Sequence, residues 1–213
     1  MKNAEALTFF YNMSHSKDCN PQSVKLAHNT DYTDIDAEFV LQYADKNTSI
    51  LDIGSGTGLI INKIYDKVKS IECVEPYAEF TKFIAKSDNI TIINEDAFKY
   101  NTTKNFDLVS LFGFIQYMSE EEALFIYKKC YKWLKQNGKI IVKNQFAVAE
   151  DVNVSGYSEE QKTEYYAQYR NIDKEVNMLK QTGFKNPKVT DIYPPEANRW
   201  NNTHFYAIVA EKE

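Results

Sequence analysis

Three glycines follow one acidic residue in the stretch Asp52–Gly58, which reads Asp-Ile-Gly-Ser-Gly-Thr-Gly. The stretch joins the apolar run 49–51 to the apolar residues 59–61, so we expect a turn between a strand and a helix. Glycine tolerates positive φ and lets the backbone approach a ligand closely. The chemistry expected at this turn is therefore the binding of a small molecule by the main chain.

An acidic residue at the end of the next apolar run strengthens this interpretation. Glu75 follows the run 70–74 along the chain. In a strand-helix-strand nucleotide site, an acid about 20 residues beyond the glycine-rich turn accepts hydrogen bonds from ribose hydroxyls. The turn and the acid together predict a ligand that contains a ribose.

Asp52 and the glycine spacing discriminate between such ligands. A carboxylate directly before the glycines would repel a pyrophosphate, whereas it suits an amino group and a positive sulfonium. Leu59 also stands where the dinucleotide pattern G-x-G-x-x-G requires its third glycine. These features favour S-adenosylmethionine over NAD. A nicotinamide-dependent oxidoreductase stays open as the alternative enzyme, and a noncatalytic cofactor-binding subunit as the alternative outside enzymes.

With these motifs, the chain from about Ser49 onward resembles the class I S-adenosylmethionine-dependent methyltransferases. The resemblance implies that the glycine-rich turn holds the methionine part of the cofactor, that Glu75 binds its ribose, and that Asp96 contacts its adenine amino group. It also implies that the strand-like run 106–111 leads into the reaction site, where S-adenosylhomocysteine is the product. The cofactor-binding residues expected in this way are Asp52, Gly54, Ser55, Gly56, Gly58, Glu75, Pro76, Asp96, Ala97 and Phe112.

Methyl transfer from a sulfonium is an in-line displacement, so the protein chiefly has to hold a nucleophile opposite the departing sulfur. A general base is needed only where that nucleophile must lose a proton. The candidates for catalysis are Tyr117, which follows the strand leading into the reaction site, and His204, which opens the last predicted strand. Each has a structural alternative, because Tyr117 could cover core residues and His204 could be a partly buried structural histidine.

Candidate acceptor-binding residues come from three parts of the chain. They are His28 and Tyr32 from the N-terminal segment, Gln116 and Gln145 near the ends of two predicted strands, and Tyr169 and Arg170 at the end of a tyrosine-rich segment. Arg170 could bind a phosphate or carboxylate with its planar fork. The alternative for the tyrosine-rich segment is a helix that uses its tyrosines for packing.

Strand-like and helix-like runs alternate from residue 49 onward. We expect strands at 49–53, 70–74, 90–93, 106–111 and 138–143, and helices near 57–67, 77–86 and 120–135. Such alternation predicts a parallel sheet covered on both faces, with ligands at the carboxyl ends of its strands. A helix that stops at Gly183 and two last strands, 188–193 and 204–210, follow. The expected fold class is α/β: a three-layer Rossmann-like methyltransferase fold with a mostly parallel sheet and an antiparallel C-terminal strand pair.

The 213 residues suit a single methyltransferase domain over 1–213. Within it we expect an N-terminal helical lid segment over 1–48 and a substrate-side insertion over 150–172. The apolar spacing of Ile35, Phe39, Val40 and Tyr43 predicts a helix in the lid segment, with Asp34 as a possible cap.

The amino-acid composition argues against several classes of binding partner. A net charge of -5 argues against nucleic acid, because such binding depends on clustered Lys and Arg. The three cysteines show no CxxC pairing and the three histidines are scattered, so no disulfide framework, zinc site or other metal is expected. No apolar run predicts a membrane span or signal segment. We therefore expect a cytoplasmic monomer or homodimer that acts on a small soluble molecule.

A second, weaker resemblance concerns the acceptor. The abundance of Lys, Asn, Ile and Tyr, with the segment Asn144-Gln145-Phe146, is similar to small bacterial methyltransferases of surface-polysaccharide pathways. Those enzymes modify sugars or phosphoramidate groups on precursors. The resemblance implies a phosphorylated or nucleotide-linked acceptor, methylated on oxygen or nitrogen.

Overall fold

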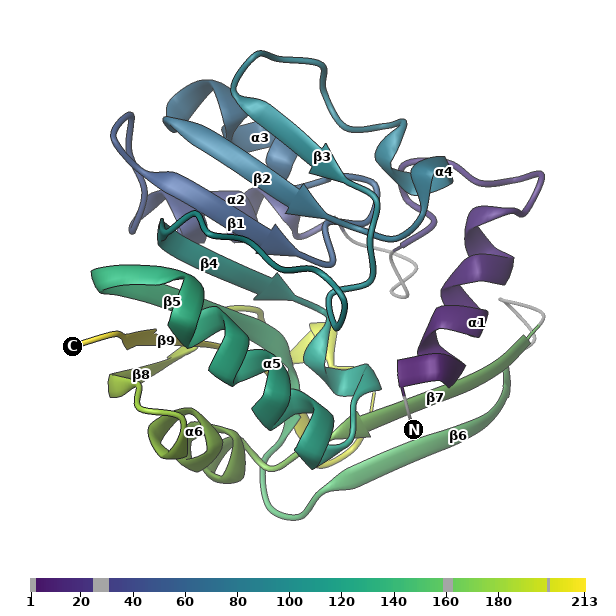
Figure 1. Ribbon diagram of the computed structural model, residues 1–213. Coiled ribbons are helices and arrows are strands. Elements are labelled where there is room, and N and C mark those ends of the chain that lie inside the picture. The colour runs from purple at the N-terminus through teal and green to yellow at the C-terminus, as the bar shows by residue number, and fades with distance from the viewer. Residues whose placement is uncertain (1–2, 25–30, 159–162, 199) are drawn as a thin grey trace.

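The computed structural model describes residues 3–24, 31–158, 163–198 and 200–213. A seven-stranded sheet in the order β3-β2-β1-β4-β5-β9-β8 forms the centre of the molecule, and β6 pairs with β7 in a separate hairpin (Figure 1). The strands are β1 Ser49–Ile53, β2 Ser70–Val74, β3 Ile90–Ile93, β4 Phe106–Phe112, β5 Leu134–Ala147, β6 Val152–Ser158, β7 Thr163–Tyr169, β8 Lys185–Asp191 and β9 Thr203–Glu211. The helices are α1 Asn3–Ser14, α2 Thr33–Leu41, α3 Ile61–Ile64, α4 Ala78–Thr81, α5 Glu120–Trp133 and α6 Ile172–Gln181, and the short 3-10 turns are η1 Tyr65–Lys67, η2 Ile115–Tyr117 and η3 Pro195–Ala197.

The direction of the strands confirms the predicted fold class. Strands β3, β2, β1, β4 and β5 are parallel, whereas β9 is antiparallel to both β5 and β8. Chain order reverses at β1, because β2 and β3 lie on one side of it and β4 and β5 on the other. Parallel sheets bind ligands outside the carboxyl ends of the strands at such a reversal. The glycine-rich turn that follows β1 stands at this place.

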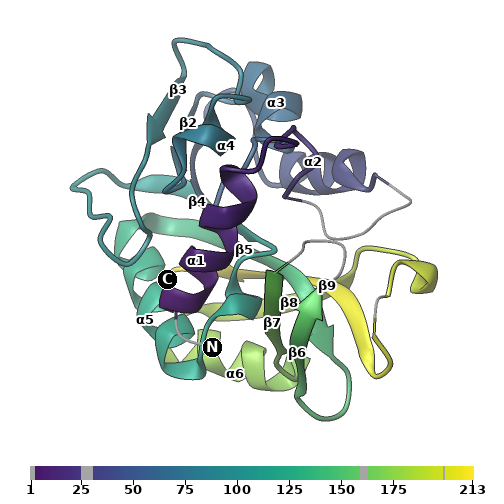
Figure 2. The same cartoon turned by 90° about the vertical axis from the view of Figure 1, so that its right-hand side faces the viewer.

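Two layers of helices cover the sheet, as Figures 1 and 2 show. Side chains alternate between the faces of a strand, so Leu51 and Ile53 pack with α5 and α6, while Ile50 packs with α2 and α3. All three are at most 1% exposed. The central strand is therefore buried on both sides, which holds the turn that follows it firmly in place.

Helix α5 begins with a capping box. The Ser119 side chain accepts a hydrogen bond from the Glu122 backbone N–H, and the Glu122 carboxylate accepts one from the Ser119 N–H. The apolar face that follows has the three- and four-residue spacing of a helix packed on a sheet, with Ala123, Ile126, Tyr127, Cys130 and Trp133 buried. This anchored start fixes the end of the preceding η2 turn, which lies beyond β4.

The tyrosine-rich segment forms the hairpin of β6 and β7, so the helical alternative is wrong. Tyr165, Ala167 and Tyr169 are buried, whereas Tyr166 and Gln168 between them are half-buried. This period of two belongs to a strand. A spacing of four residues between tyrosines fits both a helix and a strand, which is why the sequence left the choice open.

Helix α1 lies across the carboxyl ends of the strands and beside β7 (Figures 1 and 2). The Phe9 ring is 5.7 Å from the Tyr165 ring, and the Phe10 ring is 5.0 Å from the Tyr117 ring. The Tyr77 hydroxyl donates a hydrogen bond to the Leu7 carbonyl. Helix α1 thus covers the end of the sheet where a ligand is expected.

Several predicted element bounds need correction. The helix expected at 77–86 is only the single turn α4, and the one expected near 57–67 is α3 followed by η1. Strand β5 starts before 138, with Leu134 paired to Phe106 of β4, and it runs beyond 143 because β9 pairs with it from Lys139 to Ala147. The pairing partner, absent from any local pattern, decides the length of this strand.

The predicted cap of α2 is also wrong. Tyr32 is the N-cap residue of this helix, and Asp31 accepts the hydrogen bond from the Thr33 backbone N–H at 2.8 Å. Asp34 lies inside the first turn and forms an ion pair with Lys63 at 2.6 Å. An acidic residue is favourable throughout the first turn, so its presence does not fix the cap position.

Candidate functional site

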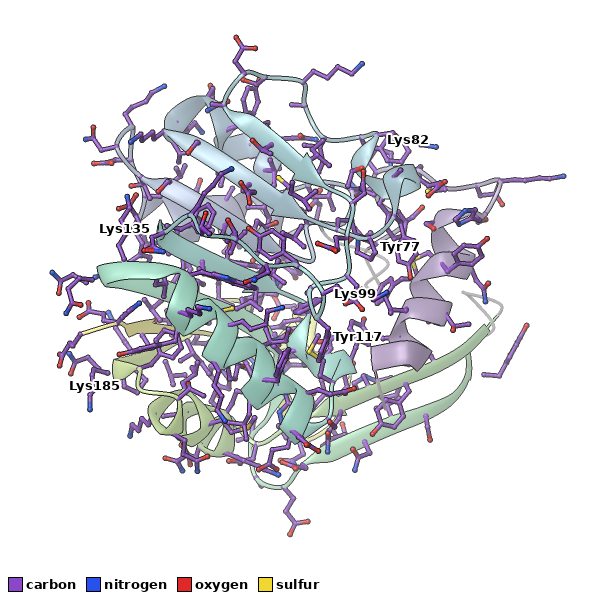
Figure 3. The ribbon with its side chains drawn as sticks, viewed as in Figure 1. Tyr77, Lys82, Lys99, Tyr117, Lys135 and Lys185 are labelled. Carbon is purple, nitrogen blue, oxygen red and sulfur yellow. The ribbon has the colours of Figure 1, made fainter. Side chains whose placement is uncertain are left out.

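A cavity of about 280 Å³ opens at the carboxyl ends of β1, β2, β4 and β5. Nine of the ten expected cofactor residues line it, which are Asp52, Gly54, Ser55, Gly56, Glu75, Pro76, Asp96, Ala97 and Phe112. Because these residues lie at or beyond the ends of four strands, β1, β2, β3 and β4, the parallel sheet is what brings them together. Figure 3 shows Tyr77 and Tyr117 on the side of the molecule that faces α1, while Lys135 and Lys185 lie at the opposite edge.

The glycine-rich turn owes its shape to positive φ angles. Gly54 and Gly56 have φ of 76° and 53°, and the backbone N–H groups of Gly54 and Ser55 both donate to the Val74 carbonyl, at 2.8 and 3.3 Å. A Cβ added at Gly54 would lie 2.6 Å from the Phe114 ring. The turn therefore needs glycine for conformation and for the close approach of its neighbours.

Gly58 is a correction to the expected cofactor set. It lies outside the residues that line the cavity. Its φ is 76°, and an added Cβ would lie 2.6 Å from the Ile84 side chain. Gly58 thus allows the turn to pack against Ile84 behind it, which is a structural reason for the third glycine.

Glu75 connects the second strand to the turn. Its carboxylate accepts hydrogen bonds from the Gly56 N–H at 3.1 Å and from the Tyr77 N–H at 3.3 Å. Burial raises the pKa of Glu75 to about 7, although both N–H donors favour its charged form. Burial also raises the pKa of Asp52, whose carboxylate accepts a 2.6 Å hydrogen bond from the Ser110 hydroxyl. The two acids give this half of the cavity a set of hydrogen-bond acceptors.

Asp96 stands at the end of the third strand, as the resemblance implies. Its carboxylate accepts the Phe98 N–H at 3.0 Å, a local turn that holds the side chain at the wall of the cavity. An acid beyond the end of a strand can also serve only to cap the next segment, and the bond to Phe98 belongs to that role. That role does not account for the place of Asp96 on the cavity wall.

Five expected catalytic or acceptor-binding residues also line the cavity, namely Tyr32, Gln116, Tyr117, Gln145 and Tyr169. The Tyr117 ring packs 5.0 Å from Phe10 and 6.4 Å from Tyr165, so it lies between α1 and the hairpin. The Tyr169 hydroxyl is 3.0 Å from the Tyr165 hydroxyl and accepts the Trp200 indole N–H at 3.2 Å. The Gln145 side chain donates to the Thr203 hydroxyl at 2.6 Å.

Arg170 is a correction, because it does not line the cavity. Its guanidinium forms a buried ion pair with Glu175 at 2.7 Å and donates to the carbonyls of Met118 at 2.7 Å and Ile115 at 3.1 Å. The side chain is 2% exposed. Its donors are engaged inside the fold, so it cannot act as the clamp for an anionic acceptor.

His204 is likewise a correction. Its ring nitrogens lie 2.6 Å from the Asp191 carboxylate and 3.0 Å from the Asn198 side chain, and the residue is not part of the cavity wall. It joins β9 to the connection that follows β8, which is a structural role. His28 lies outside the described residues.

A cluster of three polar residues on the acceptor side of the cavity was missed. The Lys143 ammonium donates to the Tyr193 hydroxyl at 2.6 Å and lies 3.2 Å from the Asp36 carboxylate, and the Tyr193 hydroxyl donates to Asp36 at 2.6 Å. The ammonium also lies 4.0 Å from the centre of the Tyr193 ring. Burial and the Asp36 charge raise the pKa of Tyr193 further above its usual value. A lysine directly after the apolar run Ile140–Val142 was the sequence signal for this cluster.

Comparison with known proteins agrees with the geometry. Residues 50–138 match the family described as a methyltransferase domain. A curated relative, phosphoethanolamine N-methyltransferase of Plasmodium falciparum, is 26% identical over 163 residues, which are 74% of this chain. The aligned region spans 59% of the length of that relative.

Solved structures with the same fold include three methyltransferases. The S-adenosylmethionine-dependent methyltransferase from Mesorhizobium loti superposes with a TM-score of 0.66 at 14% identity, over 85% of this chain and 98% of its own. The 1,6-didemethyltoxoflavin-N1-methyltransferase of Burkholderia thailandensis, solved with S-adenosylhomocysteine, has a TM-score of 0.69 at 13% identity over 99% and 88% of the two chains. The N-methyltransferase NodS of Bradyrhizobium japonicum, also with S-adenosylhomocysteine, has a TM-score of 0.66 at 10% identity over 97% of each chain.

The matched residues 50–138 include the glycine-rich turn, Glu75 and Asp96, which the sheet brings to one cavity. Domain match, fold and cavity wall agree with one another. Residues 50–138 thus match a methyltransferase domain, and the chain has the fold of S-adenosylmethionine-dependent methyltransferases.

Proposed function

We propose that this protein transfers the methyl group of S-adenosylmethionine to a nitrogen or oxygen atom of a small acceptor. The observation that carries the proposal is that the expected cofactor residues and the residues that follow β4 and β5 line one cavity. One cavity that holds both partners is what an in-line displacement requires. Helix α1 covers that cavity, which would shield the reacting groups from water.

The residues on the cavity wall fit the cofactor. The positive-φ glycines leave backbone close to the ligand, where side chains would collide with Phe114 or Val24. Glu75 would accept the ribose hydroxyls, Asp52 would face the amino group and Asp96 the adenine amino group. When bound, the cofactor supplies an electrophilic methyl group on a positive sulfonium, and the chain itself has to position the acceptor.

Tyr117 is the residue of this chain that we place nearest to the chemistry. It follows the strand that leads into the cavity and is fixed between Phe10 and Tyr165. Its hydroxyl would orient the acceptor atom, and Tyr117→Phe would then lower kcat while leaving cofactor affinity unchanged. The same variant would have little effect if the ring only packs.

Nitrogen is the acceptor atom that we favour. The relatives named for their reactions above include three N-methyltransferases, from Plasmodium, Burkholderia and Bradyrhizobium. A phosphorylated acceptor has less support, because Lys143 is the single cationic side chain among the described residues of the cavity wall and is already paired with Asp36. The acceptor from a surface-polysaccharide pathway stays a prediction from the sequence.

Calorimetry with S-adenosylmethionine, S-adenosylhomocysteine and NAD tests the cofactor. We expect the first two to bind and NAD not to bind, and the reverse order would support the oxidoreductase alternative. Release of S-adenosylhomocysteine in the presence of small amines and alcohols tests turnover. Tight cofactor binding without turnover on any acceptor would favour the noncatalytic subunit.

A further inference from the structure

Two carboxamide side chains on the acceptor side of the cavity lack hydrogen-bond partners. Asn144 lines the cavity near the end of β5 and is 2% exposed, and neither its Nδ2 nor its Oδ1 has a partner among the described residues. Gln116 lines the cavity from the η2 turn, and the described part of the chain gives its carboxamide no hydrogen bond. Buried polar groups are normally paired, so the unpartnered carboxamide of Asn144 needs an explanation, and the half-buried Gln116 stands on the same wall.

Their place in the sheet assigns them to the acceptor and not to the cofactor. Apart from Phe112 at the end of β4, the expected cofactor residues lie at or beyond the ends of β1, β2 and β3, whereas Gln116 lies beyond β4 and Asn144 belongs to β5. In the strand order, β4 and β5 lie on the other side of β1 from β2 and β3. A molecule that contacts both carboxamides would therefore lie beyond the methyl end of the cofactor.

The charged groups nearby are paired with each other, although within the described residues Asp36 Oδ1 has no hydrogen bond besides its ion pair with Lys143 at 3.2 Å. The ammonium of Lys143 is held by the Asp36 carboxylate and the Tyr193 hydroxyl. Arg170 is paired with Glu175 away from the cavity. The Lys143–Asp36 pair carries no net charge, and the other non-aromatic polar side chains that line this wall from the η2 turn and β5 are carboxamides, which offer a donor group and an acceptor group side by side.

The remaining wall is apolar and aromatic. Phe10, Phe112, Tyr117, Tyr169 and Phe205 line the cavity together with the two carboxamides. Aromatic rings pack well against flat, ring-containing ligands. An uncharged ring with hydrogen-bonding groups on its edge would satisfy both parts of this wall.

We propose that Asn144 and Gln116 form the acceptor-recognition subsite, and that the acceptor is an uncharged planar molecule with a hydrogen-bond donor next to an acceptor, such as an amide or lactam edge. The inference rests on the proposed methyltransferase function. It goes beyond that function by naming the specificity residues and the chemical class of the substrate.

Binding of three ring compounds of equal shape tests the subsite. Benzamide carries a neutral amide, benzoate a negative carboxylate and benzamidine a positive amidinium. Each compound is titrated into the protein saturated with S-adenosylhomocysteine. We expect benzamide to bind roughly tenfold more tightly than the other two, the effect of one or two hydrogen bonds. Tighter binding of benzoate, or of phosphoethanolamine as a further anionic probe, would overturn the proposal.

Variants of Asn144 separate recognition from general damage. Asn144→Leu keeps the branched shape of the side chain and should abolish the benzamide preference, while Asn144→Asp should shift the preference to benzamidine. Gln116→Met should weaken the binding of benzamide roughly threefold to tenfold. Unchanged benzamide binding in Asn144→Leu would refute the role of this residue.

Thermal unfolding provides a control that needs no ligand. Asn89 is a half-buried asparagine outside the cavity whose Nδ2 donates to the Tyr65 carbonyl at 2.7 Å. Asn89→Leu should lower the melting temperature by about 2–4 °C, whereas Asn144→Leu should not lower it, because no internal hydrogen bond is lost. An equal fall in both variants would indicate a structural role for Asn144. If the wild-type protein does not bind S-adenosylhomocysteine, the proposed methyltransferase function itself is refuted. Failure of the subsite proposal and failure of the proposed function are therefore distinguishable.

Discussion

Glu75 combines two tasks that depend on its protonation. Its carboxylate holds the glycine-rich turn through the Gly56 N–H and also lines the cavity where a ribose is expected. Burial brings its pKa to about 7, compared with an ordinary value of 4.5. The residue is therefore partly protonated at neutral pH in the free protein.

Cofactor affinity should consequently depend on pH through Glu75. The ionised carboxylate is the better acceptor for ribose hydroxyls, so affinity for S-adenosylhomocysteine should rise as the pH increases from 6 to about 8. Glu75→Gln should bind more weakly by about 1.5–3 kcal/mol at pH 8 and lose this dependence. If the ligand binds the ionised form, Glu75 releases a proton on binding, and calorimetry in buffers of different ionisation enthalpy would detect it. The same pH dependence of affinity in Glu75→Gln would contradict the assignment of Glu75 to the ribose.

The stability of the free protein should show the opposite trend. The pKa of Glu75 is raised in the folded state, so its stabilising contribution is complete below about pH 4.5 and is lost as the pH rises through 7. Compared with Glu75→Gln, the wild type should lose on the order of 3 kcal/mol of unfolding free energy across this range. Urea denaturation at pH 5 and pH 8 measures the difference.

Gly54 should be less replaceable than another glycine with the same backbone conformation. In Gly54→Ala the new Cβ would lie 2.6 Å from Phe114, whereas at Gly113, with φ of 63°, it would meet no atom within 4 Å. Gly113→Ala should cost about 1 kcal/mol for its conformation alone. Gly54→Ala should cost more and weaken S-adenosylhomocysteine binding. Denaturation midpoints of the two variants measure the difference, and equal values would exclude the collision.

At the scale of elements, Arg170 holds the η2 turn in place. It joins the end of β7 to the carbonyls on either side of that turn, and its partner Glu175 lies in α6. The Tyr127 hydroxyl of α5 also donates to Glu175. The end of β7, α5 and α6 thus meet the η2 turn at one buried ion pair, which fixes the segment that carries Gln116 and Tyr117.

Breaking this pair should damage stability more than ligand recognition. Arg170→Met leaves the Glu175 carboxylate buried without its cation and should cost about 3–5 kcal/mol of unfolding free energy. The double variant Arg170→Met/Glu175→Leu should be less destabilised than Arg170→Met alone. Chemical denaturation of the three proteins measures this order. A stable Arg170→Met protein with a selective loss of acceptor affinity would restore the anion clamp.

Helix α1 should control the escape of the cofactor. It is tied to the cofactor side by the hydrogen bond from Tyr77 to the Leu7 carbonyl. In Tyr77→Phe that bond is lost while the ring remains, so S-adenosylhomocysteine should dissociate several-fold faster. Stopped-flow displacement measures the rate, and Tyr131→Phe, whose hydroxyl bonds to the Glu213 carbonyl far from the cavity, is the matched control. Equal dissociation rates in the wild type, Tyr77→Phe and Tyr131→Phe would show that this hydrogen bond of α1 does not limit the release of the cofactor.

At the scale of the whole molecule, the cavity connects segments from across the chain. Its wall includes α1, the ends of four parallel strands, β7 and the connection after β8. Because these segments come together only in the folded chain, a ligand that fills this cavity would bind most strongly to the fully folded protein.

Among the helices that the structure describes, none has the length and apolar character needed to span a membrane.

Ligand binding should accordingly raise the stability of the entire domain. At 100 times its dissociation constant, S-adenosylhomocysteine should add about 2.7 kcal/mol to the unfolding free energy, because it binds the folded state alone. Differential scanning fluorimetry should show a clear rise in melting temperature with this ligand and none with NAD. The rise should be smaller in Glu75→Gln, and a rise with NAD instead would point to a different cofactor.

Much of the architecture could be predicted because it is encoded locally. The first three strands of the chain, 49–53, 70–74 and 90–93, have the predicted bounds, since each is a short, mostly apolar run between turn-forming residues. The helix α5 was also predicted within two residues of its end, because its amphipathic spacing is regular. The hairpin of β6 and β7 was not, because tyrosines four residues apart fit either period.

The sequence by itself determined the cofactor side of this protein, and only the tertiary structure decided the acceptor side. A glycine-rich turn and an acid at strand ends act through the backbone and through a fixed ribose, so their types and spacing are enough to predict the ligand. The roles of Arg170, Lys143 and Asn144 depend on which partners lie nearby. Glu175 engages Arg170 and Asp36 engages Lys143, whereas Asn144 is left on the cavity wall without a described partner. Pairing of buried polar groups is a property of packing between distant segments, and no local pattern of residues carries it.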